Sequence, residues 1–234
     1  RDVFDYDRRV VEQHAYREDI RSFTDLAGYL GTVENGQTFG ALAGDKGVGT
    51  FGGSEDHTAI LCCRPATVSQ YRFAPVQFER DVPMPGGHVF VVAFSGQLAE
   101  KTGAALATYN RASRAAARVL EIWLAAGGRP GGTLEAAVHE RPDAAAAIRL
   151  AIRGSGAPEA EADLLLKRFD QFVLESGTIV PGAGDALLAG DLRRFGELVD
   201  RSQRAVEDWL GNQVPETVRL ARDARTLGAV AASA

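Results

Sequence analysis

Residues 49–63 read GTFGGSEDHTAILCC, a glycine-rich segment that leads through two carboxylates and a histidine into an apolar run. Glycine adopts backbone conformations closed to other residues and lets a ligand approach the main chain closely. The apolar run that follows, residues 58–63, predicts a strand. We therefore expect a loop that presents Asp56 in front of a rigid strand, because sites mounted on rigid elements keep their geometry best.

The composition around this stretch is that of an ordinary globular protein, with 234 residues, 45% hydrophobic and 24% charged. This length predicts one large domain or two small ones. The net charge of −5 argues against a nucleic-acid partner, since such proteins carry basic patches. No apolar run reaches the length of a membrane-spanning helix, so we expect no membrane partner.

The two cysteines, Cys62 and Cys63, are adjacent in the apolar run. Neighbouring residues of a strand point to opposite faces, which disfavours a disulfide between them, and the spacing suits no metal site. We interpret both as small buried hydrophobic residues in a reducing compartment, which favours a cytoplasmic location.

On the N-terminal side, apolar residues at helical spacing predict a helix over residues 5–33 that stops at Asn35-Gly36. A long glycine-containing loop, residues 37–54, follows, and loops of that length are usually functional or mobile. After residues 58–63, β-prone runs predict three more strands, of which the last has the strongest signal: residues 67–73, 76–82 and 88–94.

The C-terminal half is predicted to be mostly helical. Its first helix carries an apolar stripe of residues three or four apart: Leu98, Thr102, Ala105, Leu106, Tyr109, Ala116, Leu120, Trp123 and Leu124. Further helices are expected over residues 133–140, 142–153, 158–176, 184–189, 191–210 and 215–225. Strands followed by helices predict an α+β fold, and the turn at Pro85-Gly86 suggests a domain boundary.

Two local motifs have competing interpretations. Residues 47–52 match the G-x-G-x-x-G pattern, but a dinucleotide site needs that pattern between a strand and a helix, so we reject this reading. Asp56 is suited to accept a proton from a substrate hydroxyl, although an aspartate beside glycines is also a common turn former or helix cap. His57 has no second histidine near it in sequence, which favours a hydrogen-bonding residue over a metal ligand.

Tyr109 lies on the apolar stripe and is read from the pattern alone as a core or rim aromatic residue. Its neighbours Asn110, Arg111 and Arg114 are expected on a solvated face.

Together these segments resemble the galactokinase branch of the GHMP small-molecule kinases. The resemblance begins with Val33-Glu34-Asn35 at the end of a helix, followed by a loop, Gly53-Ser54-Glu55-Asp56-His57 and a strand. It continues with Thr108-Tyr109-Asn110-Arg111. It ends with ALLAGDLRRFGELVDRSQRAVEDW, residues 186–209, and a helix start at Val214-Pro215-Glu216.

The resemblance implies roles for particular residues. Asp56 would be the catalytic aspartate near the sugar hydroxyl that is phosphorylated. Glu34 would be the acidic ligand of the Mg²⁺ that bridges the ATP phosphates. Gly53, Tyr109 and His57 would contact the sugar, with His57 in the place of the glutamine usual in the family.

The resemblance also implies a two-domain α+β fold with the active site between the domains. Residues 1–86 would be the rear part of an N-terminal domain like ribosomal protein S5 domain 2, and residues 87–234 a helix-rich C-terminal domain. The family's N-terminal sugar motif, serine-rich phosphate loop and C-terminal glycine-rich segment have no counterpart here. We therefore expect this sequence to be the middle and rear of a longer kinase.

The expected activity is ATP-dependent transfer of the γ-phosphate to the anomeric hydroxyl of a hexose or related sugar, with ATP and Mg²⁺ required. We expect a monomer or a weak homo-oligomer. Two alternatives remain open. One is a catalytically inactive galactokinase-like protein that senses a sugar, and the other is a GHMP kinase for a non-sugar alcohol such as mevalonate or homoserine.

Overall fold

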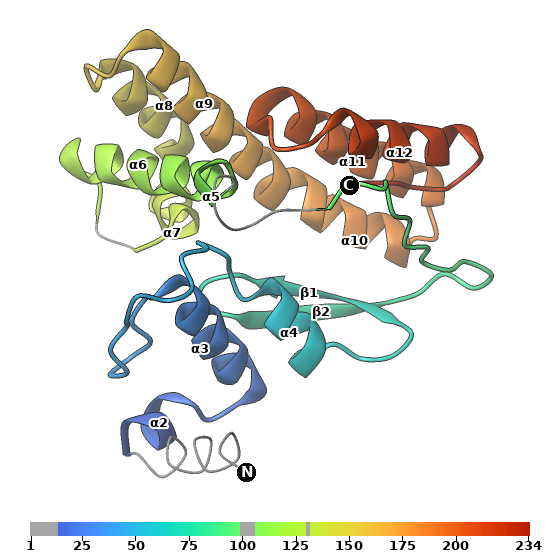
Figure 1. Ribbon diagram of the computed structural model, residues 1–234, viewed down its shortest axis with the longest axis horizontal. Coiled ribbons are helices and arrows are strands. Elements are labelled where there is room, and N and C mark those ends of the chain that lie inside the picture. The colour runs from blue at the N-terminus through green and yellow to red at the C-terminus, as the bar shows by residue number, and fades with distance from the viewer. Residues whose placement is uncertain (1–13, 99–105, 130–131) are drawn as a thin grey trace. The chain divides into compact units, whose positions relative to one another are not determined.

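The computed structural model describes residues 14–98, 106–129 and 132–234 (Figure 1). The chain divides into two compact units, Arg1–Met84 and Pro85–Ala234. In the described residues it is a mixed, helix-rich chain with one two-stranded antiparallel sheet, which agrees with the α+β class at this coarse level.

The described part of unit 1 begins with two helices, α2 (His14–Asp19) and α3 (Phe23–Asn35), where the sequence predicts a single helix. The break lies at Ser22, whose side chain caps α3 by accepting a hydrogen bond from Asp25 N at 3.1 Å. Serine is a strong N-cap residue, so this position starts a new helix. Gly36 ends α3 in the left-handed conformation, with φ of 78°. The predicted start of the first helix, residues 5–13, lies outside the described residues.

The strand predicted at residues 58–63 is wrong, because this segment forms helix α4 (Glu55–Cys62). Two carboxylates in the first turn, Glu55 and Asp56, stabilise a helix start through the helix dipole. Thr58 adds a hydrogen bond from Oγ1 to Ser54 O at 2.6 Å. The cysteine prediction also fails in part, since both thiols are free but Cys63 is exposed and Cys62 is only partly buried.

The two predicted strands that follow are confirmed as a hairpin, β1 (Thr67–Arg72) and β2 (Gln77–Pro83). Val68 pairs with Val82, which is almost completely buried. The register shifts between Gln70 and Tyr71. Tyr71 donates from its hydroxyl to Cys62 O at 3.0 Å, which links the hairpin to the end of α4.

The strand predicted at residues 88–94 does not form. The segment is assigned to no helix or strand and makes no ladder with any described residue. Its large apolar side chains are exposed. The segment is rich in β-branched and aromatic residues, but a strand also needs a neighbouring strand to receive its backbone hydrogen bonds.

From Leu106 onward, unit 2 is mostly helical where it is described (Figure 1). Its helices are α5 (Leu106–Tyr109), α6 (Arg111–Ala125), α7 (Leu134–His139), α8 (Ala144–Gly154), α9 (Glu159–Leu174), α10 (Val180–Leu188), α11 (Leu192–Ala205) and α12 (Pro215–Thr226). Leu98, where the first predicted helix begins, lies in no helix, and residues 99–105 lie outside the described residues. From Leu106 onward the predicted helices are present, with two changes. The first predicted helix is interrupted at Asn110. Helix α9 continues into α10 through a π-helical turn, η2 (Glu175–Ile179). A second π-helical turn, η3 (Val206–Leu210), extends α11.

The core of unit 2 lies among α6, α7, α8 and α9. Its buried members include Val119, Trp123, Ile148, Leu165 and Phe169. The buried face of α6 is shifted by one residue toward the N-terminus from the apolar stripe that the sequence predicts. Val119 is therefore fully buried, while Leu120 of the predicted stripe is only partly buried. Burying such side chains contributes about 1.5–3 kcal/mol each, which makes this cluster the main source of stability for the unit.

Candidate functional site

Asp56 lies in the first turn of α4, and 67% of its side-chain surface is exposed. Its Oδ1 accepts a hydrogen bond from the backbone N–H of His57 at 2.9 Å. Within the described residues, Oδ2 has no hydrogen-bond partner and is open to a partner from solution. A carboxylate held at a helix start and open to solvent is able to bind a hydroxyl and to accept its proton. The same position also suits a purely structural role, because the helix dipole favours negative charge there.

His57 lies directly beside this carboxylate, with Nε2 3.8 Å from Asp56 Oδ1. The imidazole is mostly buried, and its Nε2 has no hydrogen-bond partner among the described residues. A buried polar atom without a partner is rare and costs about 1–3 kcal/mol. The predicted sugar contact from His57 stays a prediction.

Gly53 has a packing reason to be glycine. A Cβ at this position would lie 2.2 Å from the ring of Phe73. The loop backbone therefore passes over an aromatic ring of the hairpin segment just before it enters α4. We expected glycine here because it leaves the backbone open to a sugar, and that contact stays a prediction.

Glu34 lies in the last turn of α3 and is partly buried. Its carbonyl oxygen accepts from Val48 N at 2.9 Å, and Asn35 Nδ2 donates to Gly52 O at 3.1 Å. These two bonds tie the end of α3 to the loop that leads to Asp56. The structure thus brings the predicted metal ligand and the loop of the predicted catalytic residue into one connected part of unit 1.

The glycines of residues 37–54 let this loop return to the end of α3. Gly47 has φ of 60°, and a Cβ there would lie 2.4 Å from Glu34 O. Only glycine combines that conformation with so close an approach of two backbones.

A single protein carboxylate is enough for a Mg²⁺ ion bound to a nucleotide. Such an ion keeps several water ligands and takes most of its other ligands from the phosphates. Within the described residues, no three His, Cys, Asp or Glu side chains are grouped closely enough to hold a metal by themselves. Glu34 would therefore act together with phosphate oxygens, and its role stays a prediction.

Tyr109 is the last residue of α5 in unit 2, and its side chain lies outside the described residues. The neighbouring Asn110 is completely buried, so its predicted place on a solvated face is wrong. It precedes α6 at the interruption of the helix, where its side chain is enclosed. Arg111 and Arg114 are exposed as predicted.

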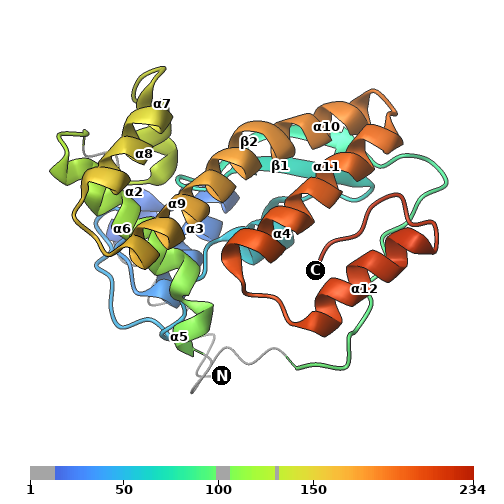
Figure 2. The same cartoon turned by 90° about the horizontal axis from the view of Figure 1, so that it is seen from above.

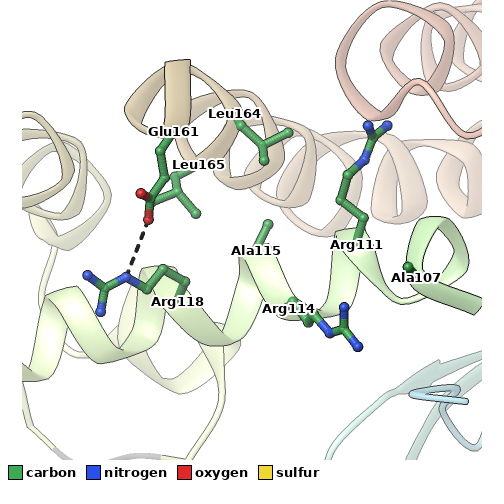
Figure 3. A pocket seen from close by; sticks show the side chains of 8 residues that line it. All are labelled: Ala107, Arg111, Arg114, Ala115, Arg118, Glu161, Leu164 and Leu165. Atoms are coloured by element: carbon green, nitrogen blue, oxygen red, sulfur yellow. Dashed lines mark ion pairs between the residues drawn. The ribbon is translucent and has the colours of Figure 1, made fainter. Parts of the chain in front are cut away.

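A shallow groove of about 220 Å³ lies between α6 and α9 and was not predicted (Figure 3). Ala115 and Leu165 form part of its apolar lining, and Arg111, Arg114 and Arg118 come from successive turns of α6. Their spacing of three and four residues is the sequence signal that would have revealed this arginine-lined face.

Two of these arginines have contacts within the protein. Arg111 donates from Nη2 to Leu210 O at 2.7 Å and to Gly211 O at 3.1 Å, which satisfies carbonyls at the end of η3. Arg118 forms an ion pair with Glu161, drawn as the dashed line in Figure 3, with 3.6 Å between Arg118 Nε and Glu161 Oε1. Arg111 and Arg118 therefore join α6 to η3 and α9. Because these contacts give both side chains a structural role, we keep Asp56 as the centre of the candidate site.

No known protein family, curated protein or solved structure matches the chain. Among residues 14–98, 106–129 and 132–234, no helix combines the length and apolar character needed to span a bilayer.

Proposed function

We propose that this chain carries the catalytic aspartate of an ATP-dependent sugar kinase of the galactokinase-like kind. The observation that supports this most directly is the exposed carboxylate of Asp56 at the start of α4. The fold proposed with it is the two-domain GHMP kinase architecture. The order of sequence segments from Glu34 to Glu216 is its basis.

In the proposed reaction, Asp56 accepts the proton of the anomeric hydroxyl while that oxygen attacks the γ-phosphorus of ATP. The bond from the γ-phosphorus to the bridging oxygen breaks, and ADP leaves with that oxygen. Phosphoryl transfer depends mainly on positioning and on charge stabilisation, so a small number of well-held side chains suffices. Bound Mg²⁺ would neutralise phosphate charge, and Glu34 is the residue proposed to hold it.

The hydrogen bonds at the end of α3 support the proposal that Glu34 and Asp56 belong to one site. Asn35 holds Gly52, and Gly52 leads within four residues to Asp56. The first turn of α4 then fixes the direction of the carboxylate. A site assembled in this way keeps its geometry better than one on a loop alone.

The test is ADP release by the intact protein, not by the isolated segment, with ATP, Mg²⁺ and a panel of hexoses, comparing wild type, Asp56→Asn and Glu55→Gln. Glu55 is the matched control, because it is an exposed carboxylate in the same helical turn. Both substitutions remove one charge from the helix start. Loss of a positioned base lowers kcat by about 10²–10⁴-fold, so we expect this loss in Asp56→Asn and near wild-type turnover in Glu55→Gln.

Equal activity in the two variants would contradict the catalytic role of Asp56. Sugar binding by the wild type without any ADP release would instead support the sugar-sensing alternative. Turnover with mevalonate or homoserine and none with sugars would move the proposal to another GHMP branch.

A further inference from the structure

Residues 88–94 form an exposed apolar segment near the start of unit 2. The sequence is HVFVVAF. Five of its side chains are between 72% and 98% exposed: Val89, Phe90, Val91, Val92 and Phe94. Single exposed apolar residues are ordinary, but a contiguous run of this kind marks an interaction site.

The backbone of residues 89–94 is also unpaired among the described residues, whereas His88 N donates to Pro85 O at 3.3 Å. Within the described residues, 89–94 belong to no ladder, and no hydrogen bond to their main chain is present. Unpaired N–H and C=O groups in a row form a template on which another strand adds. The β-branched and aromatic residues here are the ones that favour a strand once a partner is available.

The chemistry of the segment favours an identical partner. Residues 82–98 contain no Asp, Glu, Lys or Arg, so two copies meet without repulsion between like charges. A segment of six or seven residues with high β-propensity, no charge and no proline is the signature of self-association by strand pairing. A partner chosen for its charge would find no complementary charge here.

We propose that residues 88–94 pair with the same residues of a second copy of this chain, as antiparallel strands centred on Val91. In this register Val91 lies opposite Val91 of the other copy, Val89 opposite Ala93, and Phe90 opposite Val92. Phe90 and the three valines then each face another apolar side chain on the same face, whereas Phe94 faces His88. Apolar cross-strand pairs of this kind stabilise sheets.

The area available predicts weak association. An aromatic side chain buries about 150–250 Å² when it is covered. With two phenylalanines and three valines, each copy supplies several hundred Å², which is at or below the range of about 800 Å² per partner typical of stable complexes. We therefore expect a dimer that dissociates on dilution. This inference does not depend on the proposed kinase activity.

The experiment is sedimentation velocity of the full chain over a wide concentration series, with three exposed-site variants. Val91→Asp and Val91→Lys each place like charges directly opposite one another in the proposed register, so each alone should be monomeric. Val48→Asp is the matched control, because Val48 is 69% exposed and lies in the other unit. It should associate like the wild type.

Mixing Val91→Asp with Val91→Lys tests the register itself. Opposite charges then face each other at the centre of the pair, and association should return. Circular dichroism and thermal unfolding of each variant separate lost association from lost folding.

Three results would overturn the proposal. The first is a wild type that stays monomeric at every concentration. Hydrogen exchange of amides 89–94 would then identify the alternative. Slow exchange would indicate pairing with a strand of the same chain, and rapid exchange would indicate a site for another protein. The second is a Val91→Asp variant that associates as tightly as the wild type. The third is a mixture of the two charged variants that remains monomeric.

Discussion

Gly31 of α3 lies against Ser54, the residue that precedes α4. A Cβ on Gly31 would be 3.0 Å from Ser54 Cβ and 3.1 Å from Ser54 N. Both residues are buried. The two helices therefore meet through a glycine at the point where α4 begins, two residues before Asp56. The position of the candidate carboxylate depends on this close contact.

Gly31→Ala should push the start of α4 away from α3. Overpacking of a tight contact costs about 1–3 kcal/mol, against a gain of about 1 kcal/mol from the better helix propensity of alanine. We expect a net loss of stability in unit 1, measured by thermal unfolding, and weaker sugar phosphorylation. Gly154→Ala is the control, since its Cβ would meet no atom within 4 Å in α8. Equal effects of the two substitutions would show that the Gly31 contact is unimportant.

His57→Leu should leave the free energy of unfolding unchanged or raise it. The substitution removes a buried Nε2 that has no hydrogen-bond partner within the described residues. Such an atom costs about 1–3 kcal/mol, which the apolar side chain avoids. Chemical denaturation measures the change.

The comparison for His57 is Thr58→Val. Thr58 is buried and donates to Ser54 O, so the valine variant should lose about 0.5–1.5 kcal/mol. A larger loss in His57→Leu than in Thr58→Val would mean that the imidazole nitrogen has a partner after all.

Glu175 makes the stability of unit 2 depend on pH. Burial in the π-helical turn raises the pKa of its carboxyl, and hydrogen bonds from Ser202 Oγ at 3.0 and 2.9 Å oppose this only in part. A raised folded-state pKa means that the folded protein binds the proton more tightly than the unfolded chain. The resulting stability is fully present below the ordinary value of 4.5 and is lost as pH rises through the folded-state pKa.

Glu175→Gln should therefore unfold at a higher temperature than the wild type at neutral pH and show a smaller difference below pH 4.5. The amide keeps the size and the polarity of the side chain but never ionises. Melting temperatures across this pH range measure the effect. Glu197→Gln, at an exposed position of α11, should show no such pH-dependent gain. A variant difference that is constant with pH would contradict the raised pKa.

Arg225 holds residues 229 and 230 against α11. It pairs with Asp200 through two bonds, Nε to Oδ1 at 2.8 Å and Nη2 to Oδ2 at 2.9 Å, and its Nη1 donates to the carbonyls of Ala229 and Val230. In Figure 2 the end of the chain lies between α11 and α12. Lysine cannot reproduce this forked arrangement.

Arg225→Lys should increase amide exchange over residues 229–234, measured by hydrogen–deuterium exchange and mass spectrometry. Arg222→Lys is the control, because Arg222 is on the same helix with 73% of its side chain exposed. If exchange is unchanged in Arg225→Lys, the segment is held by other contacts, such as that from Gln203 to Ala234 N at 3.0 Å.

Much of the secondary structure was predictable because the sequence patterns behind it were either long or came as two matching runs. The longer helices of unit 2, α6, α8, α9, α11 and α12, follow apolar residues at helical spacing over ten or more positions. The hairpin of β1 and β2 follows two alternating runs joined by a short turn. Of the candidate site, the sequence indicated which residues to consider, Asp56, His57, Gly53 and Glu34, but not the helix that carries Asp56.

By itself, then, the sequence determined most helices of unit 2, the β1–β2 hairpin and which acidic residues are candidates for chemistry. Tertiary structure decided the two segments that were predicted wrongly. Residues 58–63 are too short and too uniformly apolar for their period to separate helix from strand, so the carboxylates at the helix start and the contact with α3 decide. Residues 88–94 have strand propensity but no described neighbour, and a strand exists only when another backbone accepts and donates its hydrogen bonds.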